Sequence, residues 1–226
     1  EYHVLRFAAA NGMPVAEPLW LQDDAATLGA RAIVMRRAPG RNFGSRIDVK
    51  DTISESLLRD ILGRLVQIHG TRLDPANADL AASHLLAWSR LPTLSDCVAR
   101  QIEFWRERSG RFGLPPAPIL ARALAWLQAN VPDNPAPPVF LHGDYGLHNV
   151  LIGDDERVSC ILDWEGCSVG DPADDLIWLS EGLKAHVERE RVLALYRELG
   201  GQAISTQRLH YFEVMNAVRF AVTCPR

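Results

Sequence analysis

The stretch that decides the fold runs from Val139 to Leu176 and reads VFLHGDYGLHNVLIGDDERVSCILDWEGCSVGDPADDL. It contains two short apolar runs, 150–152 and 158–162, on either side of the polar segment 153–156. Apolar runs of this length around a Gly-Asp-Asp-Glu segment are typical of a β-hairpin with an acidic turn. The sequence therefore predicts a hairpin in the middle of this stretch.

Polar residues flank the two strands at the open end of the predicted hairpin. Asn149 immediately precedes the first strand, and Asp163 follows the second. Because a hairpin brings the start of its first strand beside the end of its second, these two residues are expected to face one point in space. A carboxylate and an amide oxygen suit a hard cation, so the pattern predicts a Mg²⁺ site at Asn149 and Asp163. Asp144 lies just upstream, on the loop that enters this site.

The spacing Asp144-x-x-x-x-Asn149, followed by an Asp after the next strand, is the arrangement of the protein-kinase catalytic core. Together with the wording HGDYGLHN, ILDWEG and GDPADDL, it closely resembles the aminoglycoside phosphotransferase family, which shares the kinase fold but phosphorylates small molecules. Within that family the wording looks most like the broad branch that includes kinase-like domains fused to acyl-CoA dehydrogenases. The resemblance covers nearly the whole chain.

The resemblance implies a role for each polar residue of the central stretch. Asp144 would be the catalytic base that takes the proton of the acceptor hydroxyl, and Asn149 and Asp163 would hold Mg²⁺. His142 would shape the loop through hydrogen bonds, and Asp175 would bind the backbone of the catalytic loop as structural support. ATP or GTP would be the phosphoryl donor, and a small hydroxyl-bearing molecule would be the acceptor.

The resemblance also implies an α+β fold of the two-lobe, protein-kinase-like type. Residues 1–38 would be a remnant of the N-lobe with the hinge, and 39–226 would be a mostly helical C-lobe. The hinge would be the segment 34–40 (VMRRAPG), although a strand end followed by a Pro-Gly turn is the simpler interpretation of these residues alone.

Four residues near the hinge and the N-terminus would bind the nucleotide if the resemblance holds. Met35 would lie behind the adenine ring, and the Arg36 carbonyl and the Ala38 N–H would hydrogen-bond to its edge. Glu1 stands where the family has the helix Glu that pairs with a strand Lys. No Lys precedes the hinge and no G-x-G-x-x-G occurs, so we expect the rest of the N-lobe to precede Glu1 in the natural protein. A degenerate kinase without that lobe is the alternative.

Periodicity predicts the remaining elements. Strands are expected at 15–21 and 32–35, around a polar turn at 22–27. Trp88, Trp105 and Trp126 fall on helical stripes and are expected in the core. The expected helices span 1–11, 52–69, 93–109, 119–130, 171–182, 185–199 and 205–222.

Composition narrows the function classes. A net charge of −4 gives no electrostatic reason to expect nucleic acid as a partner. No apolar run reaches membrane-spanning length and no signal peptide opens the chain. The four cysteines show no C-x-x-C spacing, so neither a zinc site nor a disulfide framework is indicated, and a reducing cytoplasm is the simplest setting.

Three function classes stay open at this point. The first is a Mg²⁺-dependent phosphotransferase acting on a hydroxyl of a small molecule. The second is a pseudokinase that binds nucleotide without turnover. The third is a metallohydrolase with His142, Asp144 and His148 as zinc ligands, for which the sequence shows no fourth ligand. The acceptor and the oligomeric state do not follow from the sequence.

Overall fold

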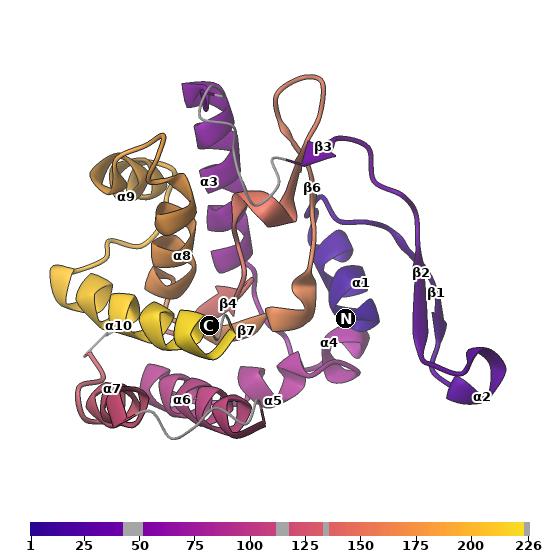
Figure 1. Cartoon of the computed structure of the whole chain (residues 1–226). Helices are drawn as coiled ribbons and strands as arrows, with labels where there is room; N and C mark the ends of the chain where they lie inside the picture. The colour runs from indigo at the N-terminus through magenta and orange to yellow at the C-terminus, as the bar shows by residue number, and fades with distance from the viewer. Residues whose placement is uncertain (43–51, 112–117, 133–135, 224–226) are drawn as a thin grey trace.

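The structure is a computed structural model that describes residues 1–42, 52–111, 118–132 and 136–223. It combines helices with small antiparallel sheets (Figure 1). The helices are α1 (Tyr2–Ala10), α2 (Ala25–Leu28), α3 (Glu55–His69), α4 (Ala78–Ala81), α5 (Leu85–Ser89), α6 (Leu94–Arg111), α7 (Pro118–Ala129), α8 (Ala173–Leu183), α9 (Arg189–Glu198) and α10 (Thr206–Thr223). The strands are β1 (Pro18–Gln22), β2 (Ala32–Met35), β3 (Arg41–Asn42), β4 (Val139–Leu141), β5 (Val150–Ile152), β6 (Val158–Ile161) and β7 (Ser168–Gly170).

The central hairpin is present as predicted. β5 and β6 pair antiparallel, with Val150 opposite Ile161. Val150 and Ile152 of β5 and Val158 and Ile161 of β6 enter the main core, where β6 contacts α3. The structure adds β3 as a third strand, with Arg41 opposite Ile152, which the sequence analysis did not predict.

β3 attaches the predicted hinge to the hairpin. The Ser159 hydroxyl on β6 donates to the Pro39 carbonyl at 2.7 Å. Gly40 has a φ of 124°, and a Cβ at that position would collide with the Ser159 hydroxyl. Only glycine accepts this backbone conformation without strain, so the hinge can lie directly against the sheet.

The main core is built from α1, α3 and the hairpin. The apolar face of α3 is buried at Leu57, Leu58, Ile61, Leu62 and Leu65. Ser54 caps the helix by accepting from the Leu57 N–H at 3.2 Å. α1 contributes its apolar side to the same cluster, which includes Phe7 against Phe140 of β4. The boundary predicted near residue 38 stays a prediction, and α1 shares its core with the elements beyond it.

β1 and β2 form a separate arm that projects from the body of the molecule (Figure 1). The turn predicted between them contains the short helix α2, capped by the Asp24 carboxylate. The first strand is shorter than predicted, because Val15 instead forms a parallel bridge with Ile161. The arm leaves Trp20 and Met35 nearly half exposed.

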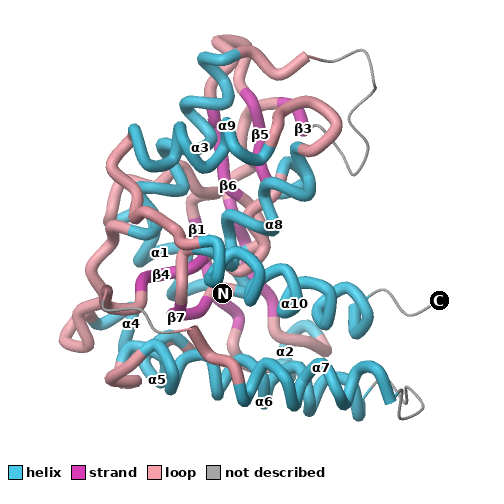
Figure 2. The backbone as a smooth tube through the Cα atoms, turned by 90° about the vertical axis from the view of Figure 1, so that its left-hand side faces the viewer, coloured by secondary structure: helices cyan, strands magenta, loops and turns pink. Residues whose placement is uncertain are grey.

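The helical half has a second core. α10 crosses α8 and lies over α6 and α7 (Figure 2), and Tyr211, Phe212 and Met215 of α10 are buried between them. Trp88 and Trp105 are buried as predicted, but the prediction for Trp126 was wrong. Its ring lies at the edge of α7 against His210 and Tyr211, with 36% of the residue exposed. In the described ranges, no helix has the combined length and hydropathy that a membrane crossing requires.

β4 and β7 form a short two-stranded ladder, with Phe140 opposite Val169. Three-residue strands carry too little pattern to be recognised in the sequence. The ladder brings the loop after β4 beside the loop before β7. Gly143 has a φ of 79°, and a Cβ there would collide with the backbone of Gly166. The two loops therefore touch backbone to backbone.

Candidate active site

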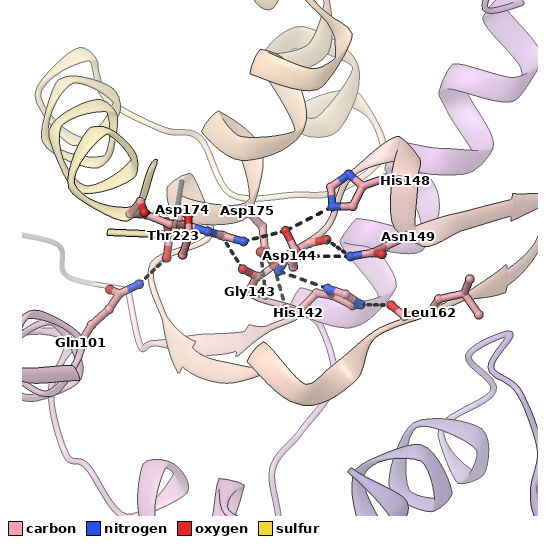
Figure 3. A network of polar contacts seen from close by, with 11 residues as sticks. Gln101, His142, Gly143, Asp144, His148, Asn149, Leu162, Asp174, Asp175 and Thr223 are labelled. Atoms are coloured by element: carbon pink, nitrogen blue, oxygen red, sulfur yellow. Dashed lines mark hydrogen bonds and ion pairs between the residues drawn. The ribbon is translucent and has the colours of Figure 1, made fainter. Parts of the chain in front are cut away.

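The loop between β4 and β5 brings Asp144 and Asn149 together (Figure 3). A short 3₁₀ turn at Leu147–Asn149 reverses the chain. The Asn149 side-chain Nδ2 then donates to Asp144 twice, to the backbone carbonyl at 3.0 Å and to Oδ2 at 3.0 Å. In the described residues, the Asn149 Oδ1 has no hydrogen-bond partner. This amide oxygen is thus available to a ligand.

The other carboxylate oxygen of Asp144 faces α10 and the end of its own loop. The Arg219 guanidinium donates to Oδ1 at 2.6 Å, and His148 Nε2 lies 3.4 Å from the same oxygen. Burial alone would raise the pKa of Asp144, but the hydrogen bond from His148 and the charge of Arg219 outweigh it and hold the pKa below its usual value. Asp144 is therefore ionised at neutral pH.

His142 joins the candidate catalytic loop, residues 142–149 between β4 and β5, to the strand end before Asp163. Its Nδ1 accepts from the Asp144 N–H at 3.2 Å, and its Nε2 donates to the Leu162 carbonyl at 3.0 Å. These partners fix the neutral tautomer, and burial lowers the pKa of the ring. Since both ring nitrogens are occupied, His142 has no lone pair for zinc. Across the described residues, no group of three or more His, Cys, Asp or Glu side chains could hold a metal ion.

Asp175 of α8 holds the backbone of the catalytic loop. Its Oδ2 accepts from the His142 N–H at 2.9 Å and its Oδ1 from the Gly143 N–H at 2.9 Å. The Nε2 of His69, at the end of α3, lies 3.2 Å from Oδ2. Burial opposes the charge of Asp175, but these contacts, above all with His69, keep its pKa low. The two backbone N–H groups are buried away from water, and the Asp175 carboxylate provides the hydrogen-bond acceptors that they need.

Asp163 lies next to Asn149 across the end of the hairpin. The Leu162 N–H donates to the Asn149 carbonyl at 2.8 Å, which places the two residues at the same end of the hairpin. Asp163 is exposed and has a left-handed backbone with φ of 60°. Non-glycine residues in this region carry strain, and such strain concentrates at functional sites. The set of donors, one carboxylate and one unpaired amide oxygen, fits a hard cation.

The four predicted nucleotide residues lie in two places. Met35 ends β2 in the arm, and Arg36 and Ala38 follow it on the chain that leads to β3. The Arg36 N–H is held by the Glu17 carbonyl at 2.9 Å. Among the described residues, the Arg36 carbonyl and the Ala38 N–H have no partner. Glu1 lies instead at the loop after β6, and its pKa is raised by burial and by the charge of Asp163.

β3 connects the hinge to the catalytic loop. The Asn42 Nδ2 donates to the His148 carbonyl at 2.6 Å, in the same turn that carries Asn149. The hinge and the candidate metal residues are thus fixed to one three-stranded sheet.

A cavity of about 480 Å³ opens beside the catalytic loop, between α6, α8 and α10. Asp174 lies on its wall, and burial together with the charge of Asp175 raises the pKa of this carboxyl to about 6. Asn216 also lines it, and its amide is buried without a partner among the described residues. The cavity has an aromatic side formed by Trp88, Phe104 and Trp105.

Sequence reasoning did not identify Arg219, Asp174 or Asn216. Arg219 and Asn216 are on a helix that the sequence predicted only as a helix, 75 and 72 positions from Asp144. No local pattern marks them, because only the packing of α10 on α8 brings them to the site. Asp174 precedes Asp175 in the motif GDPADDL, and this position in the motif is the sequence feature that could have indicated a place near the site.

The chain matches the family model described as "Phosphotransferase enzyme family" over residues 1–212. Among solved structures, a putative aminoglycoside phosphotransferase from Ralstonia eutropha superposes with a TM-score of 0.70 at 20% identity, covering 100% of this chain and 74% of that one. A macrolide 2'-phosphotransferase from Brachybacterium faecium gives a TM-score of 0.60 at 21% identity, covering 99% and 79%. These likenesses show the predicted protein-kinase-like α+β fold.

Curated relatives are more similar in sequence. Acyl-CoA dehydrogenase family member 11 from Gallus gallus is 27% identical over 183 residues, which cover 80% of this chain. The matched part is 22% of that relative, so the chain corresponds to about a fifth of its length. Both the family match and the fold confirm the resemblance drawn from the central motifs. The chain belongs to the phosphotransferase enzyme family.

Proposed function

We propose that the protein transfers the γ-phosphoryl group of a nucleoside triphosphate to a hydroxyl of a small molecule. The observation that supports this most strongly is the Asp144–Asn149 pair, held by two hydrogen bonds on one loop, with Asp163 at the adjacent strand end. The family membership agrees with it. Enzymes of this chemistry depend mainly on positioning and electrostatics, and the site is rich in fixed charges and short contacts.

Asp144 is the residue that would accept the proton of the acceptor hydroxyl. It is ionised, and its orientation is fixed by Asn149 on one oxygen and by Arg219 on the other. The backbone of its loop is fixed by Asp175, so the carboxylate meets an incoming hydroxyl without first reorganising.

Asn149 and Asp163 would hold Mg²⁺, through the unpaired amide oxygen and the exposed carboxylate. The ion, when bound, would neutralise charge on the phosphate oxygens. The hinge would receive the base of ATP or GTP through the Arg36 carbonyl and the Ala38 N–H, with Met35 behind the ring. Glu1, beside Asp163, would lie at the phosphate end of the nucleotide.

The acceptor would occupy the cavity beside Gly143 and Arg219. Unpaired buried polar atoms are unfavourable, so the Asn216 amide gains most from a ligand that both donates and accepts, as a hydroxyl does. The aromatic side of the cavity suits the apolar face of a ring. A small molecule with ring and hydroxyl groups meets both conditions.

The decisive experiment replaces Asp144 by Asn and measures single-turnover phosphoryl transfer from ATP with Mg²⁺. Asn keeps the size and polarity but cannot take a proton, so the rate should fall by about 10²–10⁴-fold while nucleotide affinity changes little. Asp154→Asn, in the exposed hairpin turn, is the matched control and should leave the rate unchanged. In the same series, Asp163→Asn should weaken Mg²⁺ binding by calorimetry while the fold survives, because Asn also tolerates the left-handed backbone.

A near-normal rate for Asp144→Asn with a lowered melting temperature would remove Asp144 from the catalytic list. Nucleotide binding without any turnover of a panel of hydroxyl-bearing metabolites would instead favour the pseudokinase.

A further inference from the structure

We propose that Arg219 is a positioning residue that holds Asp144 in its reactive orientation. This inference rests on the proposed function, since it assigns to Arg219 a part in the same reaction. Arg219 is 75 positions from Asp144 in sequence and reaches it from α10. Its guanidinium donates from Nη1 to the Gly143 carbonyl and from Nη2 to Asp144 Oδ1, the latter at 2.6 Å. One planar group thus grips both a backbone and a side-chain atom of the catalytic loop.

The guanidinium is itself held in place. Its central carbon lies 3.6 Å from the centre of the Trp178 ring on α8, which is a stacked cation–π contact. The Trp178 ring in turn packs against Phe220, with centroids 4.7 Å apart. Only 12% of the Arg219 side chain is exposed. Because the guanidinium is rigid and already rests on the Trp178 ring, it loses little further conformational freedom when it orients the Asp144 carboxylate.

The contacts that Asp144 makes with the described residues leave one direction for a substrate. A carboxylate has about four lone-pair sites. Arg219 and His148 lie on Oδ1, and Asn149 takes one site on Oδ2. An acceptor hydroxyl therefore has to approach the remaining site on Oδ2. If Arg219 did not hold Oδ1, the carboxylate could rotate about its Cβ–Cγ bond and present either oxygen.

Two other roles for Arg219 make different predictions. A purely structural tie between α10 and the loop would affect stability, and activity would follow the folded fraction. Because Arg219 also lines the cavity, it could alternatively bind an anionic group of the acceptor. That role would change the KM of the acceptor and leave reactions with water untouched.

The experiment uses the basal hydrolysis of ATP with Mg²⁺ by the full chain, so that no acceptor has to be known. Arg219→Met keeps the length and apolar contact with Trp178 but removes the fork, and Arg219→Lys keeps only the charge. We expect Arg219→Met to reduce the single-turnover rate by about 10²-fold at unchanged ATP affinity, as expected for a displaced reacting group. Arg219→Lys should recover part of the rate. Arg191→Met, an exposed arginine on α9, is the control and should match the wild type.

A double-mutant cycle distinguishes a positioning role of Arg219 from a purely structural one. In the Asp144→Asn background, Arg219→Met should cause no further loss, because both changes act through the same carboxylate. If the two losses multiply, or if the rate of Arg219→Met follows the melting temperature, the proposal is overturned. Its failure is separable from that of the proposed function. An unaffected Asp144→Asn rate rejects Asp144 itself, whereas a reduced Asp144→Asn rate with a normal Arg219→Met rate rejects only Arg219.

A crystal structure of Arg219→Met gives a readout independent of activity. Rotation or disorder of the Asp144 carboxylate is the expected result. An Asp144 side chain in the same place as in the wild type would contradict the proposal.

Discussion

At the scale of single residues, Asp174 and Asp175 are adjacent carboxyls with opposite behaviour. Asp175 accepts two backbone N–H groups and contacts His69, so its pKa is low. Asp174 receives a hydrogen bond from Gln101 and lies beside the charge of Asp175, so burial and repulsion raise its pKa to about 6. The number of hydrogen bonds to the charged form decides which of the two stays ionised.

This difference predicts how stability depends on pH. A raised pKa means that the folded protein binds a proton that the unfolded chain has released, so Asp174 makes the free energy of unfolding fall as the pH rises from about 4 to about 6. Asp174→Asn should remove this loss and stabilise the protein at pH 7 by at most about 3 kcal/mol. At pH 4 the variant and the wild type should be nearly equal. Chemical denaturation at both pH values checks this, and a stabilisation of the same size at pH 4 would contradict it.

At the scale of elements, a buried ion pair adds to the apolar core in holding the start of α10. Arg208, near the start of α10, donates from Nε and Nη2 to the two carboxylate oxygens of Asp171, at 2.8 and 2.6 Å. Asp171 also accepts from the N–H of Ala173, the first residue of α8. Both side chains are almost fully buried. α10 carries Arg219, so this pair indirectly sets the position of a residue at the site.

Asp171→Ala should therefore be strongly destabilising. It leaves the Arg208 charge buried without its carboxylate, which typically costs about 3–5 kcal/mol of unfolding free energy. Glu198→Ala, which breaks the exposed pair with Arg59, is the matched control and should cost less than about 1 kcal/mol. Urea denaturation of both variants measures the difference. Similar losses for the two would show that burial of the Asp171 pair is not what stabilises α10.

The elements that could be predicted from the sequence are those with a regular apolar periodicity or with Gly and Pro residues that mark their ends. The hairpin and α3 have regular apolar patterns, and the structure confirms both. β3 has two polar residues, Arg41 and Asn42, and is a strand only because β5 offers an open edge. Trp126 was placed in the core because it falls on a helical stripe, yet among the described residues α7 buries Leu124 and Leu127 against its neighbours and leaves Trp126 at its edge. The position of Arg219 beside Asp144 depends on how α8 and α10 pack against each other. That packing is a tertiary interaction, which no local sequence pattern predicts.

At the scale of the whole molecule, the arm of β1, α2 and β2 differs from the rest. Its large apolar side chains Leu19, Trp20, Leu28, Val34 and Met35 are each between 41% and 58% exposed. Neither β1 nor β2 contributes to the buried clusters of the described residues. With little burial to oppose opening, the arm is expected to open independently of the body.

Hydrogen exchange should show this directly. The amides of β1 and β2 should exchange by local opening at low denaturant, whereas those of α3 and β4 should require global unfolding. Saturating ATP with Mg²⁺ should slow exchange at residues 36 and 38 if the hinge binds the base. Exchange measured by mass spectrometry on the full chain resolves both segments. Equal protection of the arm and α3 would contradict the expectation.

The backbone contact between Gly143 and Gly166 has a mechanical consequence. At this contact neither residue has a side chain, so the backbone of Gly143 meets the backbone of Gly166 directly, and the His142 ring packs between the same two loops against Trp164. A displacement of one loop toward the other is resisted by hard-core repulsion, and it must be passed on as a movement of both. Asp144 and Asp163, the proposed proton acceptor and the proposed metal ligand, would then move together, and thermal motion would change their common position more than their separation.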